Sequence, residues 1–84
     1  MTVSSWRVYI LRCSDRTLYT GITTDLERRL AAHRDGSASK YTRARRPVRL
    51  VYQESHSDRS SAAKREAAIK KLSRPAKLAL IRRQ

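Results

Sequence analysis

The sequence is poor in the residues that define several large classes of protein. A single cysteine, Cys13, has no partner for an intrachain disulfide and excludes a cysteine-rich zinc site. No apolar run approaches the roughly 18 residues of a membrane-spanning helix, and no signal-peptide pattern opens the chain. We therefore expect a soluble protein of the reducing cytoplasm that does not associate with membranes.

Acidic residues are also scarce, with seven Asp and Glu against 20 Lys and Arg, which gives a formal net charge of +13. Such a charge on 84 residues favours a polyanionic partner, since contacts to phosphates release condensed counterions. Nucleic acid is the expected partner. The length suits one small domain over residues 1–84, with a core over about 6–72 and a C-terminal helix over about 74–83.

Two short strands that contain tyrosine are predicted near the start of the chain. Segments 6–13 and 17–22 are rich in β-forming residues and are separated by a polar turn. In the register that a three-residue turn would set, Tyr9 lies opposite Gly21, and Tyr19 projects from the same face as Tyr9. Because Gly21 has no side chain, we expect an open patch beside Tyr9 that a ligand or backbone can approach.

The next predicted element is a helix. Thr24 and Glu27 have the spacing of a capping box at its start. At about 100° per residue, Arg29 and His33 are one turn apart at the edge of the apolar stripe that should pack on the sheet. The adjacent Arg28 points nearly the opposite way. A charged side chain at that edge needs a partner or a task, so Arg29 and His33 are candidate functional residues.

A basic segment over residues 40–49 is predicted to be a loop, because Pro47 stops any helix there. Its cations suit contacts to a phosphate backbone, and its one tyrosine is available for stacking. A solvated, solubilising surface explains the same charges equally well. The residues assigned to nucleic-acid binding are Gly21, Lys40, Tyr41, Arg43, Arg45, Arg46 and Lys70.

Three further elements complete the predicted fold. Residues 48–52 suggest a third strand, and a helix is expected to begin after Asp58. Ser73 can cap a last helix, in which Leu78 and Ile81 would point inward. The predicted fold class is α/β (α+β), with a small three-stranded antiparallel sheet flanked by about three helices.

One carboxylate lacks a local structural role. The other acidic residues lie in turns, at helix starts or at strand ends, whereas Glu66 lies mid-helix at the margin of the buried face. It is the best candidate for a metal ligand, and a single carboxylate suits Mg²⁺ (or Mn²⁺), which keeps several waters and shares its coordination with substrate phosphate. An ion pair with Lys70, one turn later, is the structural alternative.

The order and spacing of these residues resemble the GIY-YIG nuclease superfamily, in particular its short, single-domain bacterial members. Val8-Tyr9 matches the first Ile-Tyr of the family motif, and Tyr19-Thr20-Gly21 matches Tyr-Ile-Gly. The resemblance covers residues 8–72 and implies a GIY-YIG-like fold. The residues that it places at the reaction centre are Tyr9, Tyr19, Arg29 and His33, with Glu66 as the metal ligand.

The chemistry that the resemblance implies is metal-assisted hydrolysis of phosphodiester bonds. Arg29 would neutralise charge that develops on phosphorus, and the metal would polarise a phosphate oxygen. The attacking water would lose its proton to Tyr9, Tyr19 or His33; a tyrosine could accept it if nearby positive charge lowered its pKa. Which of the three is the base stays open at this point.

We therefore expect a Mg²⁺-dependent endonuclease that acts on DNA. Branched or damaged structures are the favoured substrates, because no element for reading base sequence is evident. Targeting would then come from a partner protein or from recognition of nucleic-acid shape. The alternatives are a non-catalytic DNA- or RNA-binding module on the same fold and, third, an adaptor whose basic helices bind an acidic protein.

Overall fold

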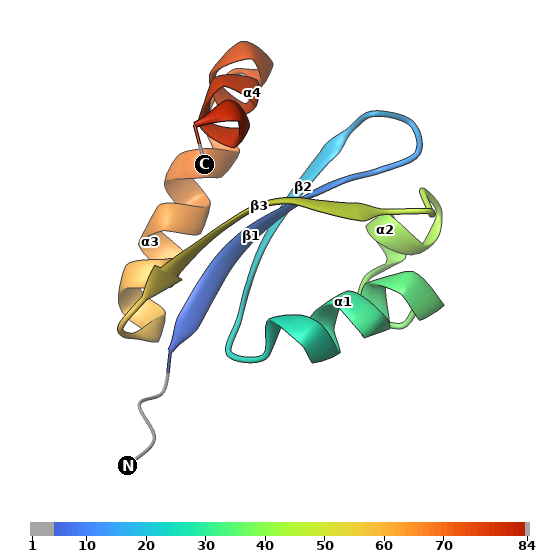
Figure 1. Cartoon of the computed structure of the whole chain (residues 1–84), viewed down its shortest axis with the longest axis horizontal. Helices are drawn as coiled ribbons and strands as arrows, with labels where there is room; N and C mark the ends of the chain where they lie inside the picture. The colour runs from blue at the N-terminus through green and yellow to red at the C-terminus, as the bar shows by residue number, and fades with distance from the viewer. Residues whose placement is uncertain (1–4, 84) are drawn as a thin grey trace.

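The computed structural model describes residues 5–83. Within that range the strands are β1 (Trp6–Arg12), β2 (Leu18–Thr23) and β3 (Arg49–His56), and the helices are α1 (Leu26–Asp35), α2 (Lys40–Arg43), α3 (Arg59–Lys70) and α4 (Arg74–Arg82). The strands form a three-stranded antiparallel sheet in the order β2-β1-β3 (Figure 1). The predicted α+β fold class is confirmed, with the short helix α2 as an addition to the helices expected. No helix among these is long and apolar enough to span a membrane.

The hairpin of β1 and β2 has the predicted register. Tyr9 pairs with Gly21, and the N–H of Cys13 donates to the carbonyl of Thr17 at 2.9 Å across the turn. Tyr19 is two positions before Gly21, and alternate residues of a strand face the same side. Tyr9 and Tyr19 therefore project from one face of the sheet.

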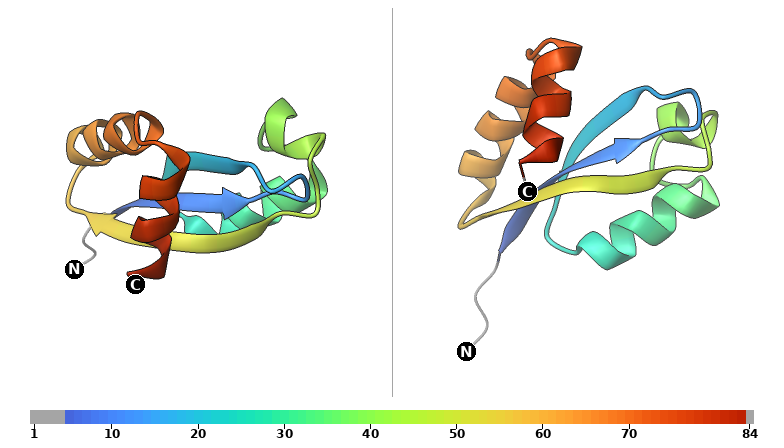
Figure 2. Two further views of the ribbon diagram at one scale, coloured as in Figure 1. Left: turned by 90° about the horizontal axis from the view of Figure 1, so that it is seen from above. Right: turned by 45° about the horizontal axis from the view of Figure 1, so that its top comes forward.

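Each face of the sheet carries its own hydrophobic core. On one face, residues of α3 and α4 pack against Val8 and Ile10 of β1, and on the other face α1 packs over Tyr9 and Leu11 (Figures 1 and 2). The run Val8–Leu11 is buried throughout because β1 is central and both of its faces are covered.

A β-bulge interrupts the pairing of β1 with β3. Ile10 pairs with Tyr52, but the next residue of β1, Leu11, pairs with Leu50, so that Val51 is the extra residue. The insertion reverses the alternation of side chains along β3. Tyr52 and Val51 consequently both pack on the α3/α4 face, whereas Leu50 joins Leu11 on the α1 face.

Helix α1 begins one residue later than its predicted capping box. The side chain of Asp25 accepts the backbone N–H of Arg28 at 3.1 Å, which makes Asp25 the N-cap. The prediction of Thr24 with Glu27 is therefore wrong. A carboxylate is a charged acceptor next to the positive end of the helix, which favours Asp25 as the cap.

Helix α4 contacts the core only through its last turn. Ser73 caps this helix as predicted, and its Oγ accepts the backbone N–H of Ala76 at 3.3 Å. Leu80 and Ile81 pack against the core, and α4 has no fully buried residue. The prediction is confirmed for Ile81, whereas Leu78 is half-buried and Leu80 packs against the core instead.

The basic segment 40–49 is not entirely a loop. Its first four residues form α2, which is capped by Ser39, whose Oγ accepts the N–H of Thr42 at 3.1 Å. Serine is among the preferred N-cap residues, and its side chain supplies the hydrogen bond that starts the helix. The loop prediction is therefore wrong for this part of the segment.

Candidate active site

The Tyr9 hydroxyl and the His33 ring form the centre of the candidate site. Tyr9 Oη on β1 lies 2.9 Å from Nε2 of His33 on α1, and the His33 side chain is buried. The other ring nitrogen, Nδ1, lies 2.8 Å from Oγ1 of Thr42 on α2, which in turn lies 2.9 Å from Oγ of Ser39. A continuous hydrogen-bonded chain thus connects the central strand to both helices of this face.

Burial determines the protonation states of Tyr9 and His33. Burial lowers the pKa of His33, and the charge of Arg29 lowers it further. Burial also raises the pKa of Tyr9 above its usual range. Both groups are therefore neutral near pH 7, so that one ring nitrogen of His33 donates a hydrogen bond and the other accepts one.

The electrostatics of the Tyr9 hydroxyl reveal which other groups lie near it. After burial, the effects on its pKa are an increase from Tyr19, a decrease from Arg29 and an increase from Glu66. Side chains from β2, α1 and α3 thus act on one hydroxyl of β1. Arg29 lowers the pKa of Tyr9 by less than burial raises it, so Arg29 alone does not lower this pKa enough for Tyr9 to act as a base.

Gly21 makes room for the Tyr9 side chain. A Cβ atom at position 21 would lie 2.5 Å from Tyr9 Oη and 2.7 Å from Tyr9 Cζ. The expected open patch is therefore wrong, because the Tyr9 ring itself fills the space. Gly21 is also buried, and its observed role is to leave room for the Tyr9 ring.

Tyr19 and Tyr41 extend the site as an aromatic stack. The Tyr19 ring meets the His33 ring edge-on, with centroids 5.3 Å apart, and stacks on Tyr41 at 5.9 Å. The Arg45 guanidinium lies 3.8 Å from the Tyr41 ring centroid, and its Nε pairs with Asp15 at 3.0 Å. Tyr41 was expected to be available for stacking on a base, but it is already stacked within the protein.

Arg29 and Glu66 approach the site from different elements. Arg29 is exposed, makes no ion pair with any residue in the range 5–83, and lines a cleft of about 310 Å³ together with Arg28. Glu66 on α3 pairs with Lys70 at 3.3 Å, and the Lys70 side chain is well exposed. The structural alternative for Glu66 is thus present, although an exposed pair at this spacing contributes only about 0.3–0.5 kcal/mol.

Comparison with known proteins shows the family to which this chain belongs. The family model described as the GIY-YIG catalytic domain matches residues 5–79. The chain belongs to the GIY-YIG family. It is therefore a member of a nuclease family, and its three-stranded sheet and the residues around Tyr9 fall within the matched range.

Several relatives of this chain are bacterial proteins named UPF0213. A UPF0213 protein of Desulfotalea psychrophila is 53% identical over 79 residues, which cover 93% of this chain and 72% of that protein. A UPF0213 protein of Staphylococcus haemolyticus is 54% identical over 74 residues, covering 88% and 90%. The solution NMR structure of a UPF0213 protein of Bacillus halodurans has a TM-score of 0.63 and 41% identity, covering 95% of this chain and 85% of that chain.

GIY-YIG nucleases generally use divalent metal ions, and the donor groups of this chain fit a metal that the substrate helps to hold. Residues 5–83 contain no group of three or more His, Cys, Asp or Glu that could hold a metal ion. A single half-buried carboxylate, that of Glu66, does suit Mg²⁺, which takes few protein ligands and completes its shell with water and phosphate. The weak pair with Lys70 is the contact that such a metal would replace.

The cations predicted to bind nucleic acid fall into two groups. Arg45 is engaged as described above, and Arg46 donates to the carbonyls of Arg43 at 3.1 Å and Arg34 at 3.2 Å. The side chains of Lys40 and Arg43 are exposed and make no hydrogen bond or ion pair with the part of the chain that is described. Among the cations predicted to bind nucleic acid, Lys40 and Arg43 are therefore the two without a side-chain partner in the described residues.

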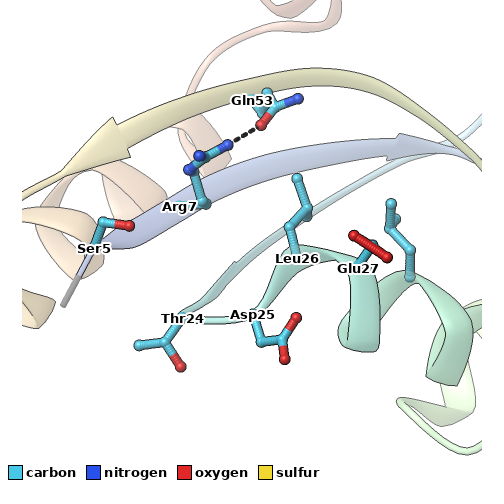
Figure 3. A pocket seen from close by; sticks show the side chains of 8 residues that line it. Ser5, Arg7, Thr24, Asp25, Leu26, Glu27 and Gln53 are labelled. Carbon is cyan, nitrogen blue, oxygen red and sulfur yellow. Dashed lines mark hydrogen bonds between the residues drawn. The ribbon is translucent and has the colours of Figure 1, made fainter. Parts of the chain in front are cut away.

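A second cleft lies apart from the predicted site. It has a volume of about 370 Å³ and lies between the sheet and the start of α1 (Figure 3). Arg7 of β1 donates to Gln53 of β3 on one side of it, and Asp25, Leu26 and Glu27 line the other. None of the predicted site residues lines this cleft, so it plays no part in the candidate site.

Two features of this region were not predicted from the sequence. Thr42 is the partner of His33 Nδ1, and Ser39 in turn contacts Thr42. A polar cluster also lies on β3, where Glu54 accepts hydrogen bonds from Tyr52 and Arg65 and lies 2.6 Å from Nε2 of His56. Glu54 was expected at a strand end but lies inside β3, where it ties the strand to α3. The alternation of Tyr52, Glu54 and His56 is the signal that could have placed them on one face.

Proposed function

We propose that the protein is a Mg²⁺- or Mn²⁺-dependent endonuclease that hydrolyses phosphodiester bonds in DNA, with branched or damaged structures as its favoured substrates. Family membership supplies the reaction class. The observation that supports a site in this chain is the convergence on the Tyr9 hydroxyl, which lies 2.9 Å from His33 Nε2 and is influenced in opposite directions by Arg29 and Glu66.

Tyr9 and His33 accept the proton of the attacking water as a pair. As the water is deprotonated, Tyr9 Oη takes its proton and passes its own proton to His33 Nε2, 2.9 Å away. The imidazolium that forms has an acceptor for each N–H, Tyr9 Oη and Thr42 Oγ1. This relay avoids a free phenolate, which burial of Tyr9 disfavours.

Arg29 stabilises the negative charge that develops on the phosphate. Its guanidinium is exposed, has no ion-pair partner among residues 5–83 and lies within electrostatic range of Tyr9. Donors of this kind typically contribute about 10²–10³ in rate. Glu66 would hold the Mg²⁺, which would supply further positive charge to polarise the phosphate and stabilise the leaving oxygen.

The free cations of α2 hold the substrate backbone. Lys40 and Arg43 are exposed, and the stack of Tyr41 on Tyr19 connects α2 to the Tyr9 centre. Contacts to phosphates position a strand without reading its bases, so selection rests on nucleic-acid shape or on a partner protein.

A cleavage panel tests this function. Single-stranded, duplex, flap and junction DNA are incubated with the wild type, Glu66→Ala and the control Glu27→Ala, with Mg²⁺, Mn²⁺ or chelator. We expect metal-dependent cleavage of a branched substrate by the wild type and by Glu27→Ala, and a loss of at least about 100-fold in Glu66→Ala with binding retained. Absence of cleavage of any substrate by the wild type contradicts the proposal.

The second candidate function is a non-catalytic module that binds DNA or RNA. The ion pair of Glu66 with Lys70 favours it, since this pair gives the carboxylate a structural role. In that case Lys40→Gln and Arg43→Gln weaken binding and flatten its salt dependence, whereas Tyr19→Phe has no effect and the wild type cleaves nothing.

A further inference from the structure

Three arginines outside the candidate active site gather at the hairpin end of the sheet. Arg12, Arg16 and Arg49 line a cleft of about 450 Å³, which also includes Pro47 and Val48. All three side chains are exposed, and none makes an ion pair or side-chain hydrogen bond with the described residues 5–83. This cluster therefore carries three charges that the described part of the protein does not neutralise.

The β-bulge places two of these arginines directly opposite each other. If the pairing of Ile10 with Tyr52 continued without interruption, Leu50 would face Arg12. The extra residue of β3 shifts the register, so that Arg12 pairs with Arg49 instead. Like charges directly opposite on neighbouring strands destabilise the pair. The arrangement is thus unfavourable for the protein without a ligand, and it suits an anion that lies between the two guanidinium groups.

The third arginine has an uncommon backbone conformation. Arg16 has a φ of 69°, in the left-handed region that non-glycine residues seldom adopt. It is the last residue of the three-residue turn, a position at which glycine is usual. The turn therefore carries a cation where the backbone favours a residue without a side chain.

The nearest carboxylate does not neutralise the cluster. Asp15 lies within the same turn, but one of its oxygens pairs with Arg45 Nε at 3.0 Å, and the other accepts from Thr17 Oγ1 at 2.6 Å and from the Thr17 N–H at 3.1 Å. Both oxygens are thus engaged by residues outside the arginine cleft.

Two of the three arginines, Arg12 and its pair Arg49, project from the face of the sheet opposite the Tyr9 centre, and Arg16 lies in the turn at the end of that sheet. Arg12 alternates with Val8 and Ile10, which pack on the α3/α4 face, whereas Tyr9 faces α1. In the left view of Figure 2, α3 and α4 lie over the far end of this face, and no described helix lies over its hairpin end. This end of the sheet is therefore open to a large ligand.

We infer that Arg12, Arg16 and Arg49 form a second phosphate-binding surface, which holds the backbone of a nucleic-acid strand on the sheet face opposite the active site. The inference rests on the proposed function for the identity of the polyanion. Three unpaired guanidiniums on an open surface suit successive phosphates, which they can bind through charge-assisted hydrogen bonds. The substrate then contacts both faces of the sheet, as a branched or bent nucleic acid can.

The salt dependence of binding tests this inference. Arg12, Arg16 and Arg49 are all changed to Gln, and the control carries Lys64→Gln, Lys71→Gln and Arg82→Gln, which removes the same charge from exposed positions. Affinity for a fluorescent branched DNA is measured in chelator between 50 and 200 mM salt.

Each phosphate contact contributes about 0.9 to the slope of log K against log salt concentration. The slope for the arginine variant should therefore be smaller by about 2–3. Its affinity should then fall roughly 16- to 64-fold less than that of the wild type between 50 and 200 mM salt. The control should lose less than about 1. Equal slopes for the two variants overturn the inference, and so does full competition by inorganic phosphate at constant ionic strength, which would identify a site for free phosphate.

A stability measurement gives an independent readout. Arg49→Gln removes the opposed charge pair, so its melting temperature at low salt should exceed that of the wild type by roughly 1–8 °C. The increase should vanish at high salt, because the repulsion is screened. An unchanged or lower melting temperature at low salt would contradict the claim that the pair is unfavourable.

Failure of this inference is distinguishable from failure of the proposed function. Binding is measured without metal, so cleavage does not enter the slopes. A wild type that cleaves DNA, with equal slopes for both variants, refutes the second surface alone. A reduced slope for the arginine variant, with a wild type that cleaves nothing, refutes the nuclease and supports the surface.

Discussion

Replacement of Gly21 by alanine should displace the Tyr9 ring. The new Cβ would lie 2.5 Å from Tyr9 Oη, whereas ordinary contact begins at 3.4 Å, so the hydroxyl must move by about 0.9 Å. Tyr9 is only 2% exposed, and a shift therefore passes to its packed neighbours and strains the hydrogen bond to His33. The backbone is not the obstacle, because Gly21 does not have a positive φ.

The expected destabilisation by Gly21→Ala has three parts. Overpacking in a core costs about 1–3 kcal/mol, and weakening a buried hydrogen bond costs about 1 kcal/mol. The lower entropy of alanine in the unfolded chain offsets about 0.4–1 kcal/mol. The net loss in the free energy of unfolding is about 1–3 kcal/mol, which lowers the melting temperature by roughly 4–24 °C in a domain of this size.

A double-mutant cycle with Tyr9→Leu isolates the contact. Thermal and urea unfolding are measured for the wild type, both single variants and the double variant. If the ring is the obstacle, Gly21→Ala should cost at least about 1 kcal/mol less in the Tyr9→Leu background. The control Gly36→Ala, strained by a φ of 90°, should cost the same in both backgrounds. Additive effects at position 21, within about 0.5 kcal/mol, would refute the reasoning.

Three further predictions follow from the same contacts. Tyr9→Phe leaves Nε2 of His33 buried without its partner and should lower the free energy of unfolding by about 1–3 kcal/mol in urea titrations; an unchanged value contradicts the assigned bond. The pKa of His33 is lowered in the folded state, so below about pH 6.5 the unfolded chain binds more protons than the folded protein. The stability that neutral His33 contributes should therefore be complete above this pH and should fall as the pH drops towards the folded pKa. The His33→Gln variant should lack this part of the pH profile of stability. Arg45→Ala removes an ion pair and a cation–π contact and should lower the free energy of unfolding by about 0.5–1.5 kcal/mol in thermal unfolding. Lys40→Gln and Arg43→Gln should instead weaken DNA binding with the melting temperature nearly unchanged. The reverse pattern would contradict the assignment of Arg45 to stability and of Lys40 and Arg43 to binding.

The hairpin and its functional side chains could be predicted because they depend on local rules. The three-residue turn sets the register, and the period of two then places Tyr9 opposite Gly21 and on the face of Tyr19. The helical period likewise brings His33 to the side of α1 that packs on the sheet. These features need only short-range spacing along the chain.

The remaining features depend on contacts between distant segments. The partner of His33, Thr42, lies on a short helix, and nothing in a basic segment indicates that a threonine will meet a buried imidazole. The space above Gly21 is filled by a ring from another strand, so the sequence could not distinguish an open patch from a packed one. The bulge at Val51 reverses the alternation of β3, which no pattern in that strand indicates.

The adjacent arginines of α1 provide the most direct test of a reaction centre at the Tyr9 hydroxyl. Arg29 influences the pKa values of Tyr9 and His33, and Arg28, one residue earlier, is a matched exposed cation. The measurement is the single-turnover rate of Mg²⁺-dependent cleavage of a branched DNA at saturating protein. We expect the rate to fall by about 10²–10³ in Arg29→Gln and to change within roughly threefold in Arg28→Gln. Equal losses in the two variants, or a wild-type rate in Arg29→Gln, would contradict this assignment of the reaction centre.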